Sequence, residues 1–579
     1  MNIRSAIQGN AEWMRDDITV IIPAAGRVPE SIMALSNITC PAMIPVAGRP
    51  VIYWTMSYLQ ALGLRRFIIA VAAHGLFIED FVECTFGQAA EVEFFVPSRD
   101  GGLGRTMLEL LNRVETPAAL AVLGDTHFQF ADSSVLERQD PFVLVQPVEE
   151  SYRWCIAETD EAGVVQALHD KVPGLPEPLL ALIGVYHFPD VHAAQEAAKQ
   201  AVAACEPLSG RTEMAAILER LGTPLQAIRA GDWLDCGNPD RQASSHRTLL
   251  QKRAFNELSI NPVLGTITKR SHHVEKFVNE INFLRLLPPD LSVLFPRMVE
   301  HSTDWEDPHL TMEYYGYPTL SEIFVFENVE PGIWEQVFEH LYQIVTGVLM
   351  RHHQPLAETT LTAMYVGKTQ HRLQALADTD TEVLHALVRH DGPLVVNGKE
   401  LHNMPTLWPE IEAAIMQMSQ GVEGSIIHGD LCFSNILYDL RGRICKLIDP
   451  RGSFGQAGIY GDPRYDIAKL YHSVYGLYDF IINDLFEIKI DGLEITFDVR
   501  ARPQHTDVLQ RFEKVFFTTF DHREILVLTG LLFISMPALH YDHPRRQLAM
   551  YVRGVELLNE ALSDYVNPEL VAKTNAHLH

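Results

Sequence analysis

The sequence predicts an α/β protein with two domains, a mixed and mostly parallel sheet followed by a bilobal α+β domain. Three observations support this. The chain has 579 residues, more than one hydrophobic core usually supports. Strand-like and helix-like segments alternate over residues 16–250. Residues 251–579 begin differently, with two strands and a helix, so we place a small lobe at about 251–330 and a larger one at about 331–579.

The first domain opens with a buried strand. Residues 17–26, DITVIIPAAG, form an apolar run ending in small residues, typical of a strand that opens onto a phosphate-contacting loop. Strand and helix patterns then alternate through CPAMIPVAGRPVIYWTMSYLQALGLRRFIIAV, VEFFVPSRDGGLGRTMLELL and AALAVLGDTHF. Because ligands of such sheets bind at the carboxyl ends of the strands, we expect Gly26, Gly102 and Asp125 to converge.

This pattern resembles the sugar-1-phosphate nucleotidyltransferases, a family that includes cytidylyltransferases for phosphocholine. The matching residues are Ala24, Ala25 and Gly26, the turn Gly48-Arg49-Pro50, Asp125, and Asp235 and Gly237 in WLDCGNPD. The resemblance covers roughly residues 16–245 and implies a Rossmann-like, GT-A-like mixed sheet.

The same resemblance implies roles for particular residues. Nucleotide contacts fall to Ala25, Gly26, Arg27 and Gly102. Asp125 and Asp235 would share a Mg²⁺, a hard cation that prefers carboxylate ligands. Lys171, in HDKVPGLPEP, would contact the substrate phosphate and act as a catalytic residue.

Two features depart from the family pattern. The loop after the first strand is shortened to AAGRVPES, and the family's lysine after a proline is missing, because Pro41 is followed by Ala42. Loss of a cation that offsets charge on the transferring phosphoryl group costs roughly 10²–10³ in rate. The candidate substitutes are Arg27, Arg49, Arg99 and Arg105.

The second domain contains the segment IIHGDLCFSNILYDLRGRICKLID, residues 426–449. Phosphoryl transfer needs a carboxylate on the attacking hydroxyl and oxygen ligands for the cation that bridges the phosphates. Asp430 is the candidate base, and Asn435 and Asp449 are the candidate Mg²⁺ ligands. The alternative is a capped polar loop between two core strands.

Together with GIYGDPRYDIAKLYHS, this segment resembles the aminoglycoside phosphotransferase and choline kinase superfamily over roughly residues 253–579. The resemblance implies ATP as phosphoryl donor and places His428 with Asp430 in the catalytic loop. It also implies that Asp466 braces that loop, a role compatible with an ordinary helix N-terminal cap.

An ATP-binding lobe is expected upstream, in NPVLGTITKRSHHVEKFVNEINFLRLLP. This stretch predicts two strands and a helix, with Lys269 at the end of the second strand and Glu280 inside the helix. A lysine on the phosphates, oriented by a helix glutamate, is the ion pair that ATP binding requires. Lys276 is the competing lysine.

Composition indicates small-molecule substrates. The net charge of −28, from 46 basic and 74 acidic residues, disfavours nucleic acid or an anionic membrane as a partner. Seven scattered cysteines without C-x-x-C spacing favour reduced thiols in the cytoplasm. The apolar run 525–539 is too short to span a bilayer, so we expect a buried helix and no membrane insertion. A homo-oligomer remains open.

The two expected activities fit one pathway. A kinase makes a phosphomonoester, and a nucleotidyltransferase joins it to a nucleotide and releases pyrophosphate. We therefore expect a bifunctional enzyme that uses ATP and a second NTP, CTP or UTP, to make an NDP-activated precursor for capsule or lipopolysaccharide. The alternatives are a first domain that only senses nucleotides or acts as a scaffold, and a kinase that phosphorylates aminoglycosides.

The acceptor of the kinase is left open by the sequence. Tyr471, Tyr475 and Tyr478 fit either an aromatic cage for choline or a plain packing stripe of a helix. Arg451 follows the Asp449-Pro450 motif and suggests an acceptor with a carboxylate, a phosphate or several hydroxyls. The alternative is that Arg451 only pairs with Asp462 or Asp466.

Overall fold

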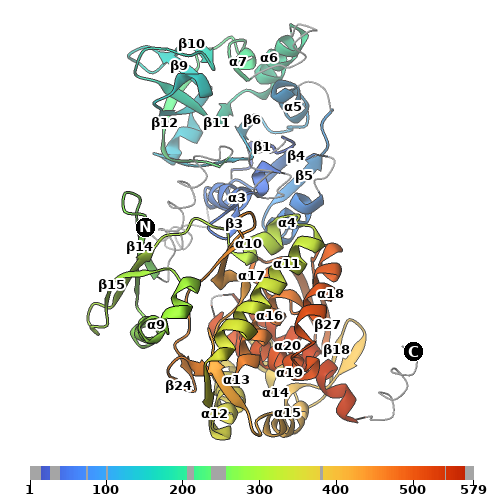
Figure 1. Cartoon of the computed structure of the whole chain (residues 1–579). Coiled ribbons are helices and arrows are strands. Elements are labelled where there is room, and N and C mark those ends of the chain that lie inside the picture. The colour runs from blue at the N-terminus through green and yellow to red at the C-terminus, as the bar shows by residue number, and fades with distance from the viewer. Residues whose placement is uncertain are drawn as a thin grey trace. The chain divides into compact units, whose positions relative to one another are not determined.

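The computed structural model describes residues 15–26, 40–72, 76–98, 102–204, 214–236, 256–377, 382–541 and 543–566. Contacts within the chain divide it into two units, Met1–Leu250 and Gln251–His579 (Figure 1).

A ten-stranded mixed sheet forms the centre of the first unit. Its order is β5-β4-β1-β6-β11-β8-β12-β7, and β9 joins β10 to β11. Strands β5, β4, β1 and β6 are parallel, whereas β11 runs antiparallel to β6 and β8. The predicted mixed α/β sheet is therefore confirmed for this unit. The strands are β1 (Ile18–Pro23), β2 (Pro45–Val46), β3 (Arg49–Pro50), β4 (Arg66–Ala70), β5 (Glu91–Phe95), β6 (Ala118–Val122), β7 (Thr126–Phe130), β8 (Phe142–Pro147), β9 (Cys155–Thr159), β10 (Val165–Asp170), β11 (Leu180–Phe188) and β12 (Gln226–Asp235).

Both faces of this sheet are covered. Successive residues of a strand point to opposite faces, and Val20 and Ile21 in β1 are both fully buried. One face packs against α5 and α6, whose Met107, Leu110 and Ala194 belong to the same core cluster as Ile21. The helices are α3 (Val51–Ala61), α4 (Leu76–Phe86), α5 (Gly102–Leu111), α6 (Val191–Ala203) and α7 (Met214–Leu218).

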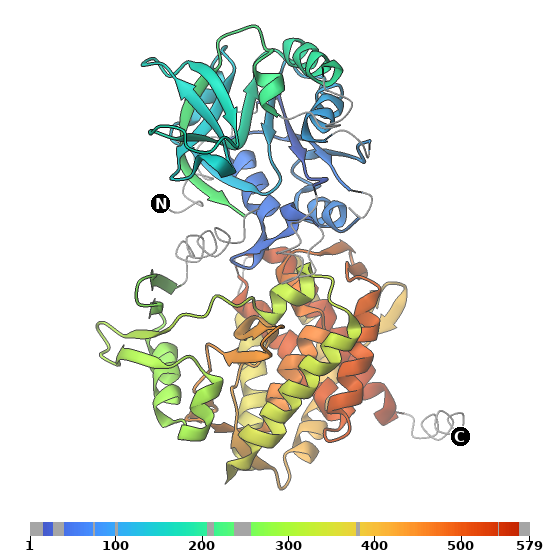
Figure 2. The same cartoon turned by 45° about the horizontal axis from the view of Figure 1, so that its top comes forward.

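The second unit begins with an antiparallel sheet of order β13-β14-β16-β15. Helix α9 (Val274–Leu286) packs on it through Phe277 and Ile281, which meet Leu310 and Met312 of β16. In Figure 2 this small sheet and its helix, in green, lie beside the larger helical part of the same unit. The strands are β13 (Asn256–Asn261), β14 (Thr266–Ser271), β15 (Met298–Ser302) and β16 (His309–Glu313).

The larger part of this unit is mainly helical. Its helices are α10 (Leu320–Phe326), α11 (Pro331–Tyr342), α12 (Glu358–Thr362), α13 (Lys368–Ala377), α14 (Glu382–Arg389), α15 (Met404–Met418), α16 (Pro463–Val474), α17 (Tyr478–Ile482), α18 (Gln504–Phe516), α19 (His522–Ser535) and α20 (Pro544–Val566). Short strands join them: β17 (His353–Pro355), β18 (Leu394–Val396), β19 (Lys399–Leu401), β20 (Glu423–Ile426), β21 (Ile436–Asp439), β22 (Ile444–Leu447), β23 (Ser453–Phe454), β24 (Gln456–Ala457), β25 (Tyr460–Gly461), β26 (Phe486–Asp491) and β27 (Glu494–Val499).

Helix α19 is the core of this part. Every residue from Ile525 to Ser535 is buried, and the helix packs against α16 and α20 (Figure 1). Within the described residues, one stretch, His522–Leu539, has the length and hydropathy of a membrane span, and 72% of it is buried inside the protein. Burial on all sides accounts for the apolar run at 525–539.

Two candidate active sites

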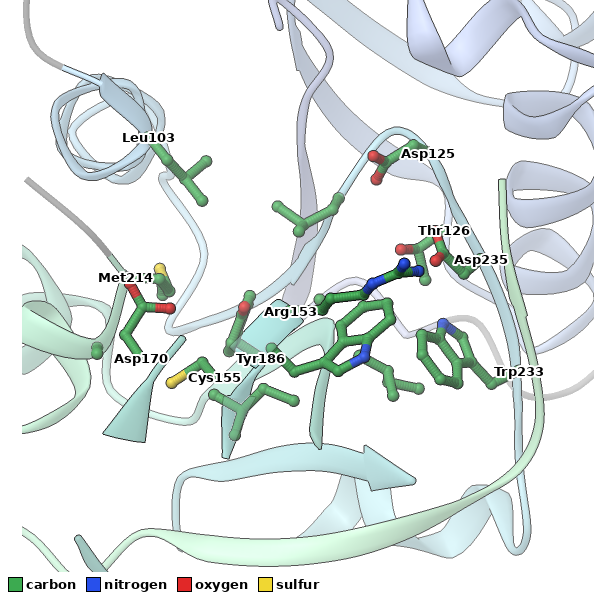
Figure 3. Close-up of a pocket in the computed structure, with 16 residues that line it drawn as sticks. Leu103, Asp125, Thr126, Arg153, Cys155, Asp170, Tyr186, Met214, Trp233 and Asp235 are labelled. Atoms are coloured by element: carbon green, nitrogen blue, oxygen red, sulfur yellow. The ribbon is translucent and has the colours of Figure 1, made fainter. Parts of the chain in front are cut away.

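The first site is a cavity of about 180 Å³ beside the ends of β6 and β12 (Figure 3). Asp125 follows β6, and Asp235 ends β12 opposite Thr126 of β7. The Cys236 N–H also donates to the Asp125 carbonyl, 3.1 Å away. The structure thus brings Asp125 and Asp235 to one cavity, whose lining residues are Leu103, Leu123, Asp125, Thr126, Arg153, Trp154, Cys155, Asp170, Leu182, Ile183, Gly184, Tyr186, Met214, Ala215, Trp233 and Asp235.

The two carboxylates fit a divalent cation. Mg²⁺ usually takes one or two protein carboxylates and fills its other positions with water and phosphate oxygens. Among the described residues no three His, Cys, Asp or Glu side chains converge on one point, so a pair of this kind is what the chain offers. Burial raises the pKa of Asp125, opposed by hydrogen bonds from its own N–H and from Thr126. A bound cation would stabilise the ionised form. The roles of both residues as ligands stay a prediction.

Aromatic side chains and one arginine complete the cavity. Trp154 and Trp233 meet edge to face, with ring centroids 5.1 Å apart. Arg153 belongs to the lining, and Figure 3 shows its guanidinium directed toward the end of the cavity where Asp125 and Asp235 lie. Sequence reasoning assigned no role to these residues, because Arg153 and Trp154 lie far in the chain from Trp233, which entered only as part of WLDCGNPD.

Ala42 occupies the position at which the family has its lysine. Ala42 is fully buried, and a Cβ added to Gly124 would lie 3.2 Å from the Ala42 Cβ. The side chain at this position therefore packs against the glycine beside Asp125 and supplies no charge. Of the proposed substitutes, Arg49 lies over the Tyr53 ring, 4.7 Å from its centroid. Among the described residues that line the cavity, Arg153 is the one with a positively charged side chain.

The other described residues predicted for this site are not among those that line the cavity. Ala25 is half-buried and Gly26 exposed after β1, and Gly102, at φ 71°, starts α5. Lys171 is exposed directly after Asp170 of the lining, and its N–H donates to the Trp154 carbonyl at 2.8 Å. Arg27, Arg99 and Gly237 lie outside the described residues.

The second site begins with a buried ion pair. The ammonium of Lys269 in β14 lies 2.9 and 2.8 Å from the two carboxylate oxygens of Glu280 in α9. It also lies 2.8 Å from Oδ1 of Asp449. Burial alone would lower the pKa of Lys269, but the carboxylates of Asp449 and Glu280 raise it above its usual value. Lys276, the competing lysine, is exposed.

A second set of contacts holds the loop that follows β20. The Asp466 carboxylate in α16 accepts the N–H of His428 at 2.7 Å and that of Gly429 at 2.8 Å. Burial lowers the pKa of His428 to about 4, so its ring is neutral at pH 7. Its Nε2 lies 2.9 Å from the Ile448 carbonyl, and its Nδ1 accepts the Asp430 N–H at 3.3 Å. Both ring nitrogens of His428 thus contact backbone groups of the site, and its catalytic role stays a prediction.

The hairpin β21–β22 brings the predicted metal ligands together. Asn435 precedes β21, Asp449 follows β22, and the Ile448 N–H donates to the Asn435 carbonyl at 3.0 Å. The Asn435 amide nitrogen donates to the Asp430 carbonyl at 2.9 Å. Its amide oxygen is thereby oriented as an acceptor. With the Asp449 carboxylate, whose side chain is 44% exposed, it would offer Mg²⁺ two oxygen ligands, and these roles stay a prediction.

Asp430 is ionised and accessible. Its Oδ1 lies 2.8 Å from the ammonium of Lys469, and its side chain is 41% exposed. Burial alone would raise the pKa of Asp430. The positive charge of Lys469 and the hydrogen bond from its ammonium outweigh burial and hold that pKa below its usual range. Sequence reasoning missed Lys469. It lies one turn after Asp466 in YDIAKL, so helical spacing could have indicated that both face the same loop.

The residues proposed to bind the acceptor make two kinds of contact, ring packing by Tyr471 and Tyr475 and a hydrogen bond by Arg451. Tyr471 is fully buried and stacks on Tyr475 and Phe512, with centroids 5.1 and 5.5 Å away, which is a packing stripe. Arg451 pairs with neither Asp462 nor Asp466. Its guanidinium donates to the Tyr465 hydroxyl at 3.0 Å.

Comparison with known proteins concerns the N-terminal two fifths of the chain. A glucose-1-phosphate thymidylyltransferase from Streptomyces griseus is 25% identical over 242 residues, covering 39% of this chain and 65% of that protein. The match thus spans slightly less than two thirds of the relative's length. No family model matches the chain. The N-terminal region therefore resembles the sugar nucleotidyltransferases.

Solved structures give similar matches. A glucose-1-phosphate thymidylyltransferase from Bacillus anthracis, in complex with sucrose, is 20% identical and covers 41% of this chain and 97% of that one, with a TM-score of 0.36. HddC from Yersinia pseudotuberculosis is 18% identical and covers 40% and 99%, with a TM-score of 0.34.

Proposed function

We propose that the chain is a bifunctional enzyme. Its second unit would transfer the γ-phosphoryl group of ATP to a small hydroxyl-bearing acceptor. Its first unit would join the resulting phosphomonoester to a nucleotidyl group from an NTP, with release of pyrophosphate. The product would be an NDP-activated precursor, for which surface polysaccharide is the expected use. Action in the cytoplasm, on small molecules alone, belongs to the same proposal.

The convergence of Asp125 and Asp235 on one cavity supports the first activity. The unit that carries them is similar in sequence to a thymidylyltransferase. In the proposed reaction an oxygen of the phosphomonoester attacks the α-phosphorus of the NTP. The two carboxylates would hold Mg²⁺, which would neutralise phosphate charge. Arg153, whose guanidinium is directed toward the same end of the cavity (Figure 3), would offset the charge on the transferring group. CTP and UTP are the expected nucleotides, and the relative adds dTTP.

The arrangement around Asp430 carries the proposal for the second activity. Asp430, kept ionised by Lys469, would accept the proton of the attacking hydroxyl. Lys269, held by Glu280, would bind ATP phosphate oxygens. Asn435 and Asp449 would hold Mg²⁺, which would offset the negative charge of the ATP phosphates. Asp466 and His428 would keep the loop in place.

The test measures both activities in single-site variants. Pyrophosphate release is followed with CTP, UTP, GTP, ATP and dTTP against a panel of phosphomonoesters, and ADP formation against a panel of hydroxyl acceptors. We expect Asp430→Asn to abolish phosphorylation while pyrophosphate release persists. Asp125→Asn should do the reverse. Loss of both activities in either variant would contradict two independent sites.

A second candidate is a kinase whose first unit only binds nucleotides or acts as a scaffold. Buried Ala42 in place of the family's lysine favours it. The paired carboxylates argue against it, because a scaffold needs no cation site. ADP formation without pyrophosphate release from any pair of substrates would select this candidate.

A further inference from the structure

We infer that the hydroxyl acceptor of the second unit is anionic, and that Lys368, Arg372 and Arg451 bind its carboxylate or phosphate group beside Asp430. The inference rests on the proposed kinase function and specifies the substrate class of that site. It goes against a choline-like acceptor, whose positive charge this group of side chains would repel.

Two helices and one loop build the group. Lys368 and Arg372 are four residues apart on α13, so they share a face of that helix. Tyr465 and Lys469 are likewise four apart on α16. The Lys368 ammonium donates to the Tyr465 hydroxyl at 3.2 Å, and the Arg451 guanidinium donates to the same oxygen at 3.0 Å. Two cations from segments far apart in sequence thus meet on one phenol oxygen.

This region contains more positively charged than negatively charged side chains. Lys469 is paired with Asp430. For Lys368, Arg372 and Arg451, no carboxylate lies within 4.0 Å among the described residues. The Arg372 guanidinium donates instead to the Ser535 carbonyl and hydroxyl, both at 3.2 Å. Partly buried cations without a counter-ion are costly, and an anionic ligand would supply the missing charge.

The Tyr465 hydroxyl reports how positive this region is. Burial alone would raise its pKa, yet Lys368 and Arg451 lower that pKa to about 8. A phenol that becomes more acidic inside the protein lies in a field that stabilises negative charge. Because both cations donate to its oxygen, its own hydrogen is left to donate to a ligand.

The group borders the reacting atoms. Arg451 lies two residues after Asp449, and its N–H donates to the His428 carbonyl at 2.9 Å. A Cβ added to Gly429 would lie 2.9 Å from the Arg451 Cβ, so this side chain packs directly on the loop of Asp430. An acceptor whose hydroxyl contacts Asp430 would therefore extend its anionic group toward Lys368 and Arg451.

The phosphoryl transfer requires no reactant besides the acceptor and ATP. The acceptor hydroxyl oxygen forms a bond to the γ-phosphorus of ATP, and the bond from that phosphorus to the bridging oxygen of ADP breaks. The hydroxyl proton passes to Asp430, and ADP leaves with the bonding electrons. The cationic group takes no part in bond formation, so it acts in binding and orientation.

The test compares matched acceptors with the full-length protein and Mg²⁺-ATP. The pairs are glycerate against glycerol, glycerol 3-phosphate against glycerol, and galacturonate against galactose, with choline as the cationic member. We expect kcat/KM for an anionic member to exceed that for its neutral partner by about 100-fold, as charge-assisted hydrogen bonds allow. The carboxylate and phosphate arms show which anion is used. Preference for a neutral or cationic acceptor would overturn the inference and leave the kinase in place.

Two variants locate the effect. Lys368→Met and Arg372→Gln should each raise KM for the anionic acceptor by about tenfold or more, with KM for ATP unchanged. Lys399→Met, which removes an exposed lysine in β19, is the matched control. Circular dichroism checks that each variant folds. Unchanged acceptor KM in both variants would overturn the inference.

A binding measurement separates this inference from the proposed function. Inorganic phosphate and glycerate, each titrated alone into the full chain, should bind more weakly to Lys368→Met than to the wild type or Lys399→Met. Equal binding to all three would overturn the inference even if ATP is consumed. Weaker binding to Lys368→Met, with no ADP formed from any acceptor, would keep the anion site and overturn the kinase.

Discussion

At the scale of single residues, Asp466 is the side chain on which the geometry of the second site depends. Its two carboxylate oxygens accept the N–H groups of His428 and Gly429, the two residues before Asp430. It lies in the first turn of α16, where the helix dipole favours negative charge. Burial raises its pKa to about 7, and the two hydrogen bonds oppose that rise. Asp466 thus acts on the backbone of the loop before Asp430 rather than on a substrate.

Replacement of this carboxylate gives a specific prediction. In Asp466→Asn one oxygen becomes an NH₂ group, which faces a backbone N–H and leaves it unsatisfied. We expect kcat for phosphorylation to fall by about 10²-fold through misplacement of Asp430, with KM for ATP little changed. The measurement is steady-state ADP formation. Asp439→Asn, at the end of β21, is the control, and full activity of Asp466→Asn would refute the bracing role.

The sequence predicted some residues of this site and not others, for a physical reason. His428, Asp430, Asn435 and Asp449 lie on one loop and one hairpin, so short-range spacing determines their convergence. Residues such as Lys368 and Arg153 reach their sites only through tertiary packing of distant segments. Nothing local distinguishes them from surface charges.

At the scale of elements, the loop after Asp449 approaches helix α9 closely at one point, Gly452. Gly452 has a φ of 64°, and a Cβ there would lie 2.1 Å from the Asn279 carbonyl oxygen. Asn279 precedes Glu280, which holds Lys269. This close approach therefore links the position of the loop to the ion pair on the small sheet.

Gly452→Ala should disturb that link. The new methyl group meets backbone, which cannot rotate away, and the left-handed φ adds strain of about 1 kcal/mol or more. We expect α9 to shift, KM for ATP to rise by about tenfold, and Tm to fall. Gly332→Ala, where a Cβ meets nothing within 4 Å, is the control. An unchanged KM for ATP would show that α9 is not positioned by this contact.

The elements themselves were predictable to different extents. The apolar runs identified β1, β4 and β6, because strands covered on both faces are apolar throughout. The placement of β12 between β8 and β7 depends on pairing between residues about 100 positions apart, and it has no local signature. That placement is what brings Asp235 to Asp125.

At the scale of the whole molecule, an acidic chain contains a local positive site. The net charge of −28 disfavours polyanionic partners over most of the surface, whereas Lys368, Arg372 and Arg451 concentrate positive charge next to Asp430. In the proposed reaction the chain would select small anions by local geometry rather than by its overall field. A phosphorylated acceptor of this kind matches the phosphomonoester that the first unit is proposed to use.

The central claim is that one acceptor molecule passes through both reactions, and a double-label experiment tests it most directly. The full-length protein is incubated with the acceptor, ATP labelled at the γ-phosphorus with ³³P, and NTP labelled at the α-phosphorus with ³²P. We predict one product that carries both labels, lost in Asp430→Asn and replaced by the singly labelled phosphomonoester in Asp125→Asn. Two labels that always appear on separate products would contradict the account.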